Sequence, residues 1–206
     1  MKKIDLKKTY KQFYQPSSKA IEDITVPAFN FLMVNGVGDP NTAISFQEAV
    51  GALYSLSYTI KFSNKSESPD FDFTVMPLEA LWWSKNMDAF TDGKKDEWEW
   101  TCMIHQPDFI SEADVISAKE SVMKKKDLFA VNDVRFETFE EGRSAQILYI
   151  GPYADEASTI KNIHQFISDA DCELSGYHHE IYLSDPRRTA PEKLKTIIRQ
   201  PMRSKE

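Results

Sequence analysis

One short segment, GYHHEIYLSD at 176–185, has side chains whose types and spacing could do chemistry. The segment reads as a strand, and Glu180 lies at its centre. Glutamate has a low strand propensity and resists burial without a partner, so its presence there needs a reason. Strand side chains alternate, so His178, Glu180 and Tyr182 share one face while His179 lies on the other. We expect Glu180 to be a site residue.

The chemistry that Glu180 could do depends on its surroundings. We expect His179, Ile181 and Leu183 to lie beneath helices, which places Glu180 on a helix-free face. A carboxylate between aromatic walls loses hydration, which raises its pKa, and an incoming cation restores the charged form. The same raised pKa suits a general acid or base. The alternative is a structural ion pair between Glu180 and a nearby arginine or lysine on an open sheet face.

Metal and cofactor chemistry have little support in the sequence. The adjacent His178 and His179 resemble a metal-binding pair, but neighbouring strand residues point to opposite faces, so we expect no metal. Cys102 and Cys172 fit no CxxC spacing and are expected to be buried, reduced thiols. No GxSxG signature of a serine nucleophile is present. We expect no cofactor.

The composition limits the classes of partner. Lysine and arginine number 25 against 32 aspartates and glutamates, so the formal charge is −7, which disfavours direct nucleic-acid binding. No apolar run reaches the length of about 18 residues that a membrane span requires, and no signal peptide is recognisable. We therefore expect a cytoplasmic protein without membrane association.

Hydrophobic periodicity predicts that a strand, helix, strand, strand unit occurs twice. CMIHQP ends at Pro107 and TIIRQP ends at Pro201, and these short matches fit a duplication, although chance could also supply them. A hairpin that turns at Gly142 opens the second unit, and Asp92 and Gly93 form a turn in the first. The expected elements are strands at 24–40, 73–84, 97–107, 176–185 and 194–201, helices at 44–62, 111–126 and 156–170, and the hairpin at 134–151.

These elements predict an α+β fold of two halves related by a pseudo-twofold axis. Each half forms an antiparallel sheet with helices on one face, and a ligand cleft lies between the halves. Either half alone would expose a bare sheet edge, so we expect one domain. The expected organisation is an N-terminal arm at 1–20 and a domain at 21–206, with half one at about 21–110, a linker helix at about 111–127 and half two at about 128–206.

Aromatic residues are the expected walls of this cleft. Aligning Ser84 with Ser184 places Trp82 opposite Tyr182 and Ala80 opposite Glu180, so the second half supplies the acid. Trp82 and Trp83 point to opposite faces, and the repeat favours Trp82. All these aromatics could instead belong to the core. The predicted ligand-binding residues are Glu180, Tyr182, Trp82, Trp100, which lies deeper in its strand than Trp98, and Tyr149.

Three segments of the chain resemble a known family. They are the GPYADE turn at 151–156, the acidic strand HHEIYLSDP at 178–186 and the segment PEKLKTIIRQP at 191–201. Together with the duplicated unit, they resemble the stand-alone GyrI-like small-molecule-binding proteins over nearly all of the chain after about residue 20. The resemblance implies two related half-domains around a ligand cleft with a central glutamate, and Glu180 matches that position.

The resemblance also implies a choice of functions. Relatives include effector-binding domains of multidrug-responsive regulators, which bind lipophilic, often cationic, aromatic compounds, and we expect such drug or toxin binding here. The alternative is a hydrolase that confers toxin resistance by opening the cyclopropane rings of DNA-alkylating natural products, with Glu180 as general acid or base. A second alternative is a gyrase-inhibitor-like protein interaction module, with gyrase as the partner.

Overall fold

The chain divides into two compact units, each of which is described by itself. A computed structural model describes residues 2–67, 71–84, 94–125 and 128–205. The first unit contains the chain up to Thr9 and Phe29–Phe139, and the second contains Tyr10–Ala28 and the chain from Glu140 onwards. Both units are therefore discontinuous in sequence. The strands β2 (Glu22–Val37) and β6 (Arg135–Ile150) each contribute residues to both units.

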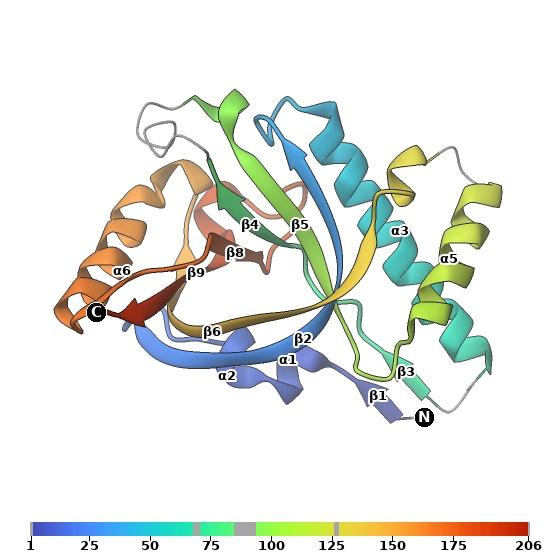
Figure 1. Ribbon diagram of the computed structural model, residues 1–206, viewed down its shortest axis with the longest axis horizontal. Helices are drawn as coiled ribbons and strands as arrows, with labels where there is room; N and C mark the ends of the chain where they lie inside the picture. Colours follow the sequence, from blue (N-terminus) through green and yellow to red (C-terminus); the bar gives the residue numbers. More distant parts are fainter. Residues whose placement is uncertain (1, 68–70, 85–93, 126–127, 206) are drawn as a thin grey trace. The chain divides into compact units, whose positions relative to one another are not determined.

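In the first unit, an antiparallel sheet carries helices on one face (Figure 1). Its central strand, β5 (Glu99–Gln106), pairs with β4 (Glu79–Trp83) and with residues 30–37 of β2. The side-chain amide of Gln106 donates to the hydroxyl of Ser57 in α3 (Ile44–Glu67). The helix therefore lies on the face of the sheet to which Gln106 points. The remaining elements are β1 (Lys2–Ile4), which pairs in parallel with β3 (Phe71–Phe73), and α1 (Leu6–Thr9), η1 (Lys95–Glu97), α5 (Glu112–Lys125) and η2 (Phe129–Val131).

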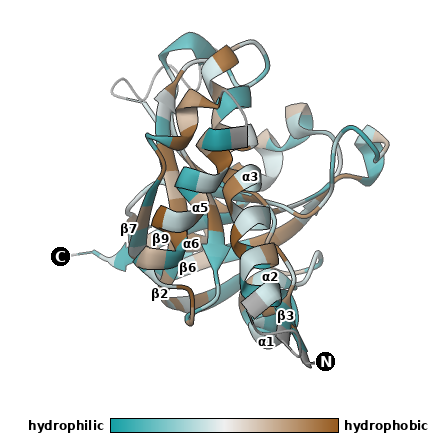
Figure 2. Ribbon diagram, turned by 90° about the vertical axis from the view of Figure 1, so that its right-hand side faces the viewer, coloured by the Kyte–Doolittle hydropathy of each residue, from teal (hydrophilic) through white to brown (hydrophobic). Residues whose placement is uncertain are grey.

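The helices of the first unit form because their apolar residues recur at helical spacing. Leu53, Leu56 and Ile60 of α3 are buried, and hydrophilic residues separate the hydrophobic ones along α3 and α5 (Figure 2). At the start of α5, the Ser111 backbone N–H donates to Asp114 Oδ2 at 2.8 Å, and the Asp114 N–H donates to Ser111 Oγ at 3.3 Å. This reciprocal cap confirms the predicted start of the helix.

In the second unit, β9 (Lys195–Ser204) pairs antiparallel with three strands. They are β6, β7 (Cys172–Leu174) and β8 (His178–Tyr182). The helix α6 (Ala157–Asp169) lies along this sheet (Figure 1) and buries Ile163 and Ile167. These two side chains form a core cluster with Ala145, Cys172, Ile198 and Met202. The short elements are α2 (Lys11–Tyr14), η3 (Tyr153–Asp155) and η4 (Pro191–Lys193).

The opposite face of this sheet carries a buried network of charged and polar side chains. Arg199 Nη1 donates to Glu141 Oε2 at 2.8 Å, and His179 Nδ1 lies 2.9 Å from Glu141 Oε1. Arg199 also donates to the Gln146 side chain at 3.0 Å and to the backbone carbonyl of Phe13 at 2.7 Å. The network therefore fastens the 10–28 segment to strands that lie more than a hundred positions later in the sequence.

The observed architecture agrees with the predicted fold class and order of elements and differs from the prediction at one hairpin. The α+β class with antiparallel sheets is confirmed, and the order strand, helix, strand, strand occurs in each unit. The predicted hairpin is wrong, because β6 is a single strand from Arg135 to Ile150. Gly142 adopts a φ of 75° within β6 without reversing the chain. Residues 144–150 pair with β9 instead of folding back on the residues before Gly142. The predicted turn at Asp92 and Gly93 lies outside the described residues.

Residues of the predicted arm and linker are parts of these units. Leu6 belongs to the first unit, whereas Phe13 and Tyr14 belong to the second, and all three side chains are buried. The predicted linker helix corresponds to α5, which packs against α3 within the first unit. Among the helices of the described ranges, none combines the length and apolar character needed to cross a bilayer.

Candidate functional site

The alternation predicted for the strand of Glu180 is present in β8. His179 and Ile181 are buried, whereas His178, Glu180 and Tyr182 are half-buried on the other face. His178 Nε2 lies 3.0 Å from Glu180 Oε1, and His179 interacts with Glu141 on the opposite face. The two histidines therefore point in opposite directions, as predicted. In the described part of the chain, no cluster of three or more histidine, cysteine, aspartate or glutamate side chains is arranged to hold a metal ion.

The prediction that Glu180 lies on a helix-free face is wrong. Glu180 pairs with Ile198 of β9, and paired residues of neighbouring strands point to the same side. Ile198 packs against Ile163 and Ile167 of α6, so the helix lies on the face of Glu180. The apolar residues of α6 cover the cluster around Ile198, whereas the polar Glu156 precedes the first turn of the helix. Glu180 therefore lies on the same face of the sheet as α6.

A second acid, Glu156, interacts with Glu180 and was not predicted as a site residue. Glu156 is the N-cap residue of α6 and is only 4% exposed. Its Oε1 has no hydrogen-bond partner among the described residues. Burial and, next, the negative charge of Glu180 raise the pKa of Glu156 to about 9. At neutral pH, Glu156 therefore carries a proton, which makes its carboxyl group a hydrogen-bond donor.

The buried Glu156 should reduce the stability of the protein at neutral pH. Between its ordinary pKa of 4.5 and about 9, the folded chain holds a proton that the unfolded chain has released, so stability falls as pH rises. Glu156→Gln removes this cost and should stabilise the protein by roughly 1–3 kcal/mol near neutral pH. Urea unfolding at several pH values measures the effect. An unchanged slope of stability against pH in the variant would contradict the assignment.

Two tyrosines form an aromatic wall beside the carboxyl pair. The rings of Tyr153 and Tyr182 meet edge to face, with centroids 5.7 Å apart and planes at 81°. Burial raises the pKa of Tyr153 to about 12, and the charges of Glu156 and Glu180 add to this effect. Both acids therefore lie within electrostatic reach of the Tyr153 hydroxyl. The combination of ring faces and carboxyl groups is suited to a cationic ligand.

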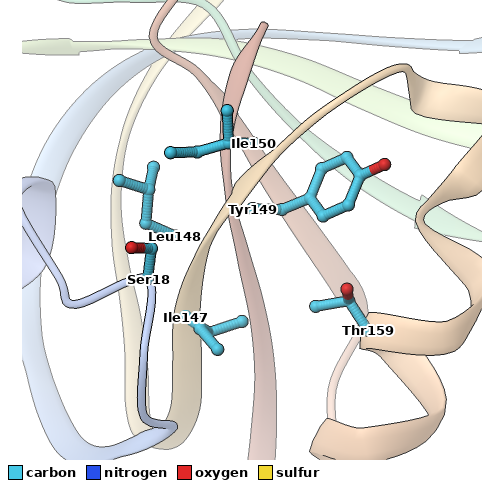
Figure 3. Close-up of a pocket in the computed structure, with 6 residues that line it drawn as sticks. All are labelled: Ser18, Ile147, Leu148, Tyr149, Ile150 and Thr159. Carbon is cyan, nitrogen blue, oxygen red and sulfur yellow. The ribbon is translucent and has the colours of Figure 1, made fainter. Parts of the chain in front are cut away.

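Tyr149 holds the turn that leads to Glu156. Its hydroxyl donates to the carbonyl of Pro152 at 2.9 Å. A Cβ on Gly151 would lie 2.6 Å from this hydroxyl, and the φ of Gly151 is 152°, so the close approach requires glycine. Tyr149 also lines a pocket of about 340 Å³, in which its ring and Thr159 lie on the α6 side of β6 (Figure 3). The other lining residues are Ser18, Ile147, Leu148 and Ile150.

The predicted tryptophans lie in the first unit and share one face of its sheet. Trp82 pairs with Trp100, and Phe46 of α3 contacts both rings, with centroid distances of 5.8 and 5.1 Å. Trp82 and Trp100 are 5% and 1% exposed. Trp83 points to the other face, where its indole N–H donates to Glu99 at 3.1 Å. Trp82 and Trp83 therefore point to opposite faces, as predicted, while the choice of Trp82 for the cleft and the role of Trp82 and Trp100 as ligand walls stay predictions.

Of the predicted site residues, Glu180 and Tyr182 lie together in the structure. Three residues that were not predicted to be part of the site lie beside them, namely Glu156, Tyr153 and His178. The sequence held one signal for the first two additions, namely the GPYADE motif that ends at Glu156. An acid at the start of a helix also complements the helix dipole, so Glu156 had an ordinary structural explanation. His178 was considered as a metal ligand, whereas its observed partner is a carboxylate.

Comparison with known proteins identifies relatives over nearly the whole chain. The family described as the GyrI-like small molecule binding domain matches residues 20–203. An uncharacterized conserved protein from Listeria innocua has 43% identity and a TM-score of 0.89 over 97% of this chain and 100% of its own. A hydrolase from Listeria innocua has 44% identity and a TM-score of 0.87 over 98% and 100% of the two chains. Another hydrolase from that organism has 42% identity and a TM-score of 0.85 over 97% and 100%. Comparison with proteins of curated function gave no match.

Proposed function

Because the chain belongs to the GyrI-like small molecule binding domain family, we propose that it binds lipophilic aromatic or cationic small molecules at Glu156 and Glu180. The observation that carries this proposal is the pair of interacting carboxyl groups beside the rings of Tyr153 and Tyr182. A cation placed between them would offset the burial and the negative charge of Glu180, which together keep Glu156 protonated. Each contact between the cation and a ring would add about 0.5–2 kcal/mol.

A second candidate function, hydrolysis, is favoured by the unequal protonation of the two acids. Catalysis of hydrolysis needs a proton donor for the leaving group and a base for water. The protonated Glu156 fits the donor, and Glu180 fits the base. On a strained cyclopropane, water would add to a ring carbon, the carbon–carbon bond would break, Glu180 would take the water proton, and Glu156 would protonate the released electron pair. The two relatives described as hydrolases support this candidate.

One experiment separates the two candidates. The protein is incubated with cationic aromatic dyes, with neutral aromatics of similar shape and with cyclopropane-bearing alkylators. Mass spectrometry follows both the complexes and the products. Intact bound dye supports the binding function, and a product heavier by one water supports the hydrolase. Absence of both complex and product across the panel would contradict the proposed function.

A further inference from the structure

A basic side chain lies directly beside Glu180, and neither candidate function uses it. His178 Nε2 is 3.0 Å from Glu180 Oε1. The two side chains are 17% and 15% exposed, so most of each is shielded from water. Residues two apart in a strand point to the same side, so the backbone of β8 itself holds the imidazole next to the carboxylate.

We infer that His178 is a positioning residue that orients the Glu180 carboxylate and controls the affinity of the site for cations through its own protonation. This inference deepens the proposed function, on which it rests, because it concerns the same site. A base that is held by a third group is a common arrangement in enzymes, and the same arrangement serves a binding carboxylate. Here His178 is the orienting group, and Glu156 is the acid that interacts with Glu180.

Other titratable groups also face this pair, and they define the alternatives. Glu156 acts on Glu180 from the start of α6, and His164 of the same helix interacts with His178. Asp185, which follows β8, acts on the nearby Tyr153. From β9, the residues paired with Glu180 and Tyr182 are Ile198 and Thr196, which carry no charge. His178 differs from these other groups because it lies within hydrogen-bond distance of the Glu180 carboxylate.

The protonation state of His178 should decide what Glu180 offers to a ligand. A neutral imidazole with its proton on Nε2 donates a hydrogen bond, which fixes the carboxylate and leaves its negative charge available. A protonated imidazole places a positive charge 3.0 Å from the same oxygen and competes with an incoming cation.

Two substitutions at His178 separate orientation from charge. His178→Gln keeps a hydrogen-bond donor but cannot ionise, and His178→Leu removes both properties. The probes are 10-methylacridinium, a permanent cation, and 10-methylacridone, a neutral molecule of similar shape. Fluorescence is measured from about pH 5 to about pH 7, a range in which Glu156 keeps its proton. The parent should bind the cation about tenfold more weakly at the acidic end. His178→Gln should show no such decline, and His178→Leu should bind the cation about tenfold more weakly at every pH.

The inference is overturned if His178→Gln keeps the pH dependence of the parent, which would assign it to Glu156, His164 or Asp185. It is also overturned if His178→Leu binds the cation as the parent does. Failure of the parent to bind either probe would contradict the proposed function instead. In that case, carbon-13 NMR of the Glu180 carboxyl group decides the inference: its shift should follow the titration of His178 in the parent and not in His178→Gln. An identical response in both proteins would refute it.

Discussion

Glu141→Gln is expected to lower the free energy of unfolding of the second unit by about 3–5 kcal/mol, because it leaves the buried Arg199 and His179 without their carboxylate. The side chains of Glu141 and Arg199 are 2% and 3% exposed, so water cannot replace the lost partner. Replacing Glu141 and Arg199 together by methionine should cost less than the single change, since no unpaired arginine then stays buried.

The same carboxylate should make the second unit sensitive to acid. Burial alone would raise the pKa of Glu141, but the charges of His179 and Arg199 outweigh it and lower the pKa from 4.5 to about 2. A depressed folded pKa gives stability that is present above about pH 4.5 and is lost as pH falls toward 2. Glu141→Gln should lack this loss of stability in the same range.

Two probes separate the units in this measurement. All four tryptophans lie between positions 82 and 100, in the first unit, so indole fluorescence follows that unit. Hydrogen exchange of the β9 amides follows the second. The matched control is Asp23→Asn, which breaks the exposed ion pair with Arg143 and should have a much smaller effect. Equal protection of β9 in Glu141→Gln and in the control would show that the buried network is not needed for stability.

Glu180→Gln should keep the fold and remove most of the function, because it deletes the negative charge and retains the shape of the side chain. For a binding protein, cationic aromatics should lose about 1.5–3 kcal/mol of affinity, and neutral aromatics much less. For a hydrolase, turnover should fall by about a hundredfold or more. Titration with a matched cationic and neutral pair, together with a single-turnover assay on a cyclopropane substrate, measures both.

The control for this substitution is Glu173→Gln on β7. Glu173 forms an exposed ion pair with Arg203 and belongs to the same unit, so the change in net charge is equal while the site is untouched. If Glu173→Gln weakens cation binding as much as Glu180→Gln does, the effect comes from the overall charge of the protein, and Glu180 is not a ligand-binding residue. A much lower melting temperature in Glu180→Gln would instead make Glu180 a structural residue.

The local alternation of β8 could be predicted from the sequence, but the position of the helix above it could not. Alternation follows from the strand geometry of each residue, whereas the face that a helix covers depends on which apolar residues from other segments complete a core. Here Ile198 and Met202 of β9 form a core cluster with residues of α6, so the helix covers the face of the sheet on which Glu180 lies. The apolar residue Ile181, which looked like the helix-facing one, instead shares its face with the network of Arg199 and Glu141.

The predicted order of elements is present in both units, but the two sequence matches that suggest a duplication give different registers. Matching Pro107 with Pro201 aligns Cys102 with Thr196. Cys102 pairs with Ala80 and Thr196 pairs with Tyr182, so Ala80 corresponds to Tyr182 and not to Glu180. Short sequence matches cannot fix a strand register, because a shift of two residues keeps every side chain on its face.

The discontinuity of the second unit has a consequence for the chain during translation. Residues 10–28 leave the ribosome before β9, the strand with which β6, β7 and β8 all pair. At about 5–20 residues per second, the intervening stretch takes on the order of 10 s to synthesise. During that time Phe13 and Tyr14, which the finished unit buries, lack β9, whose Arg199 donates to the Phe13 carbonyl. We therefore expect the nascent chain to depend on a holding chaperone until β9 emerges.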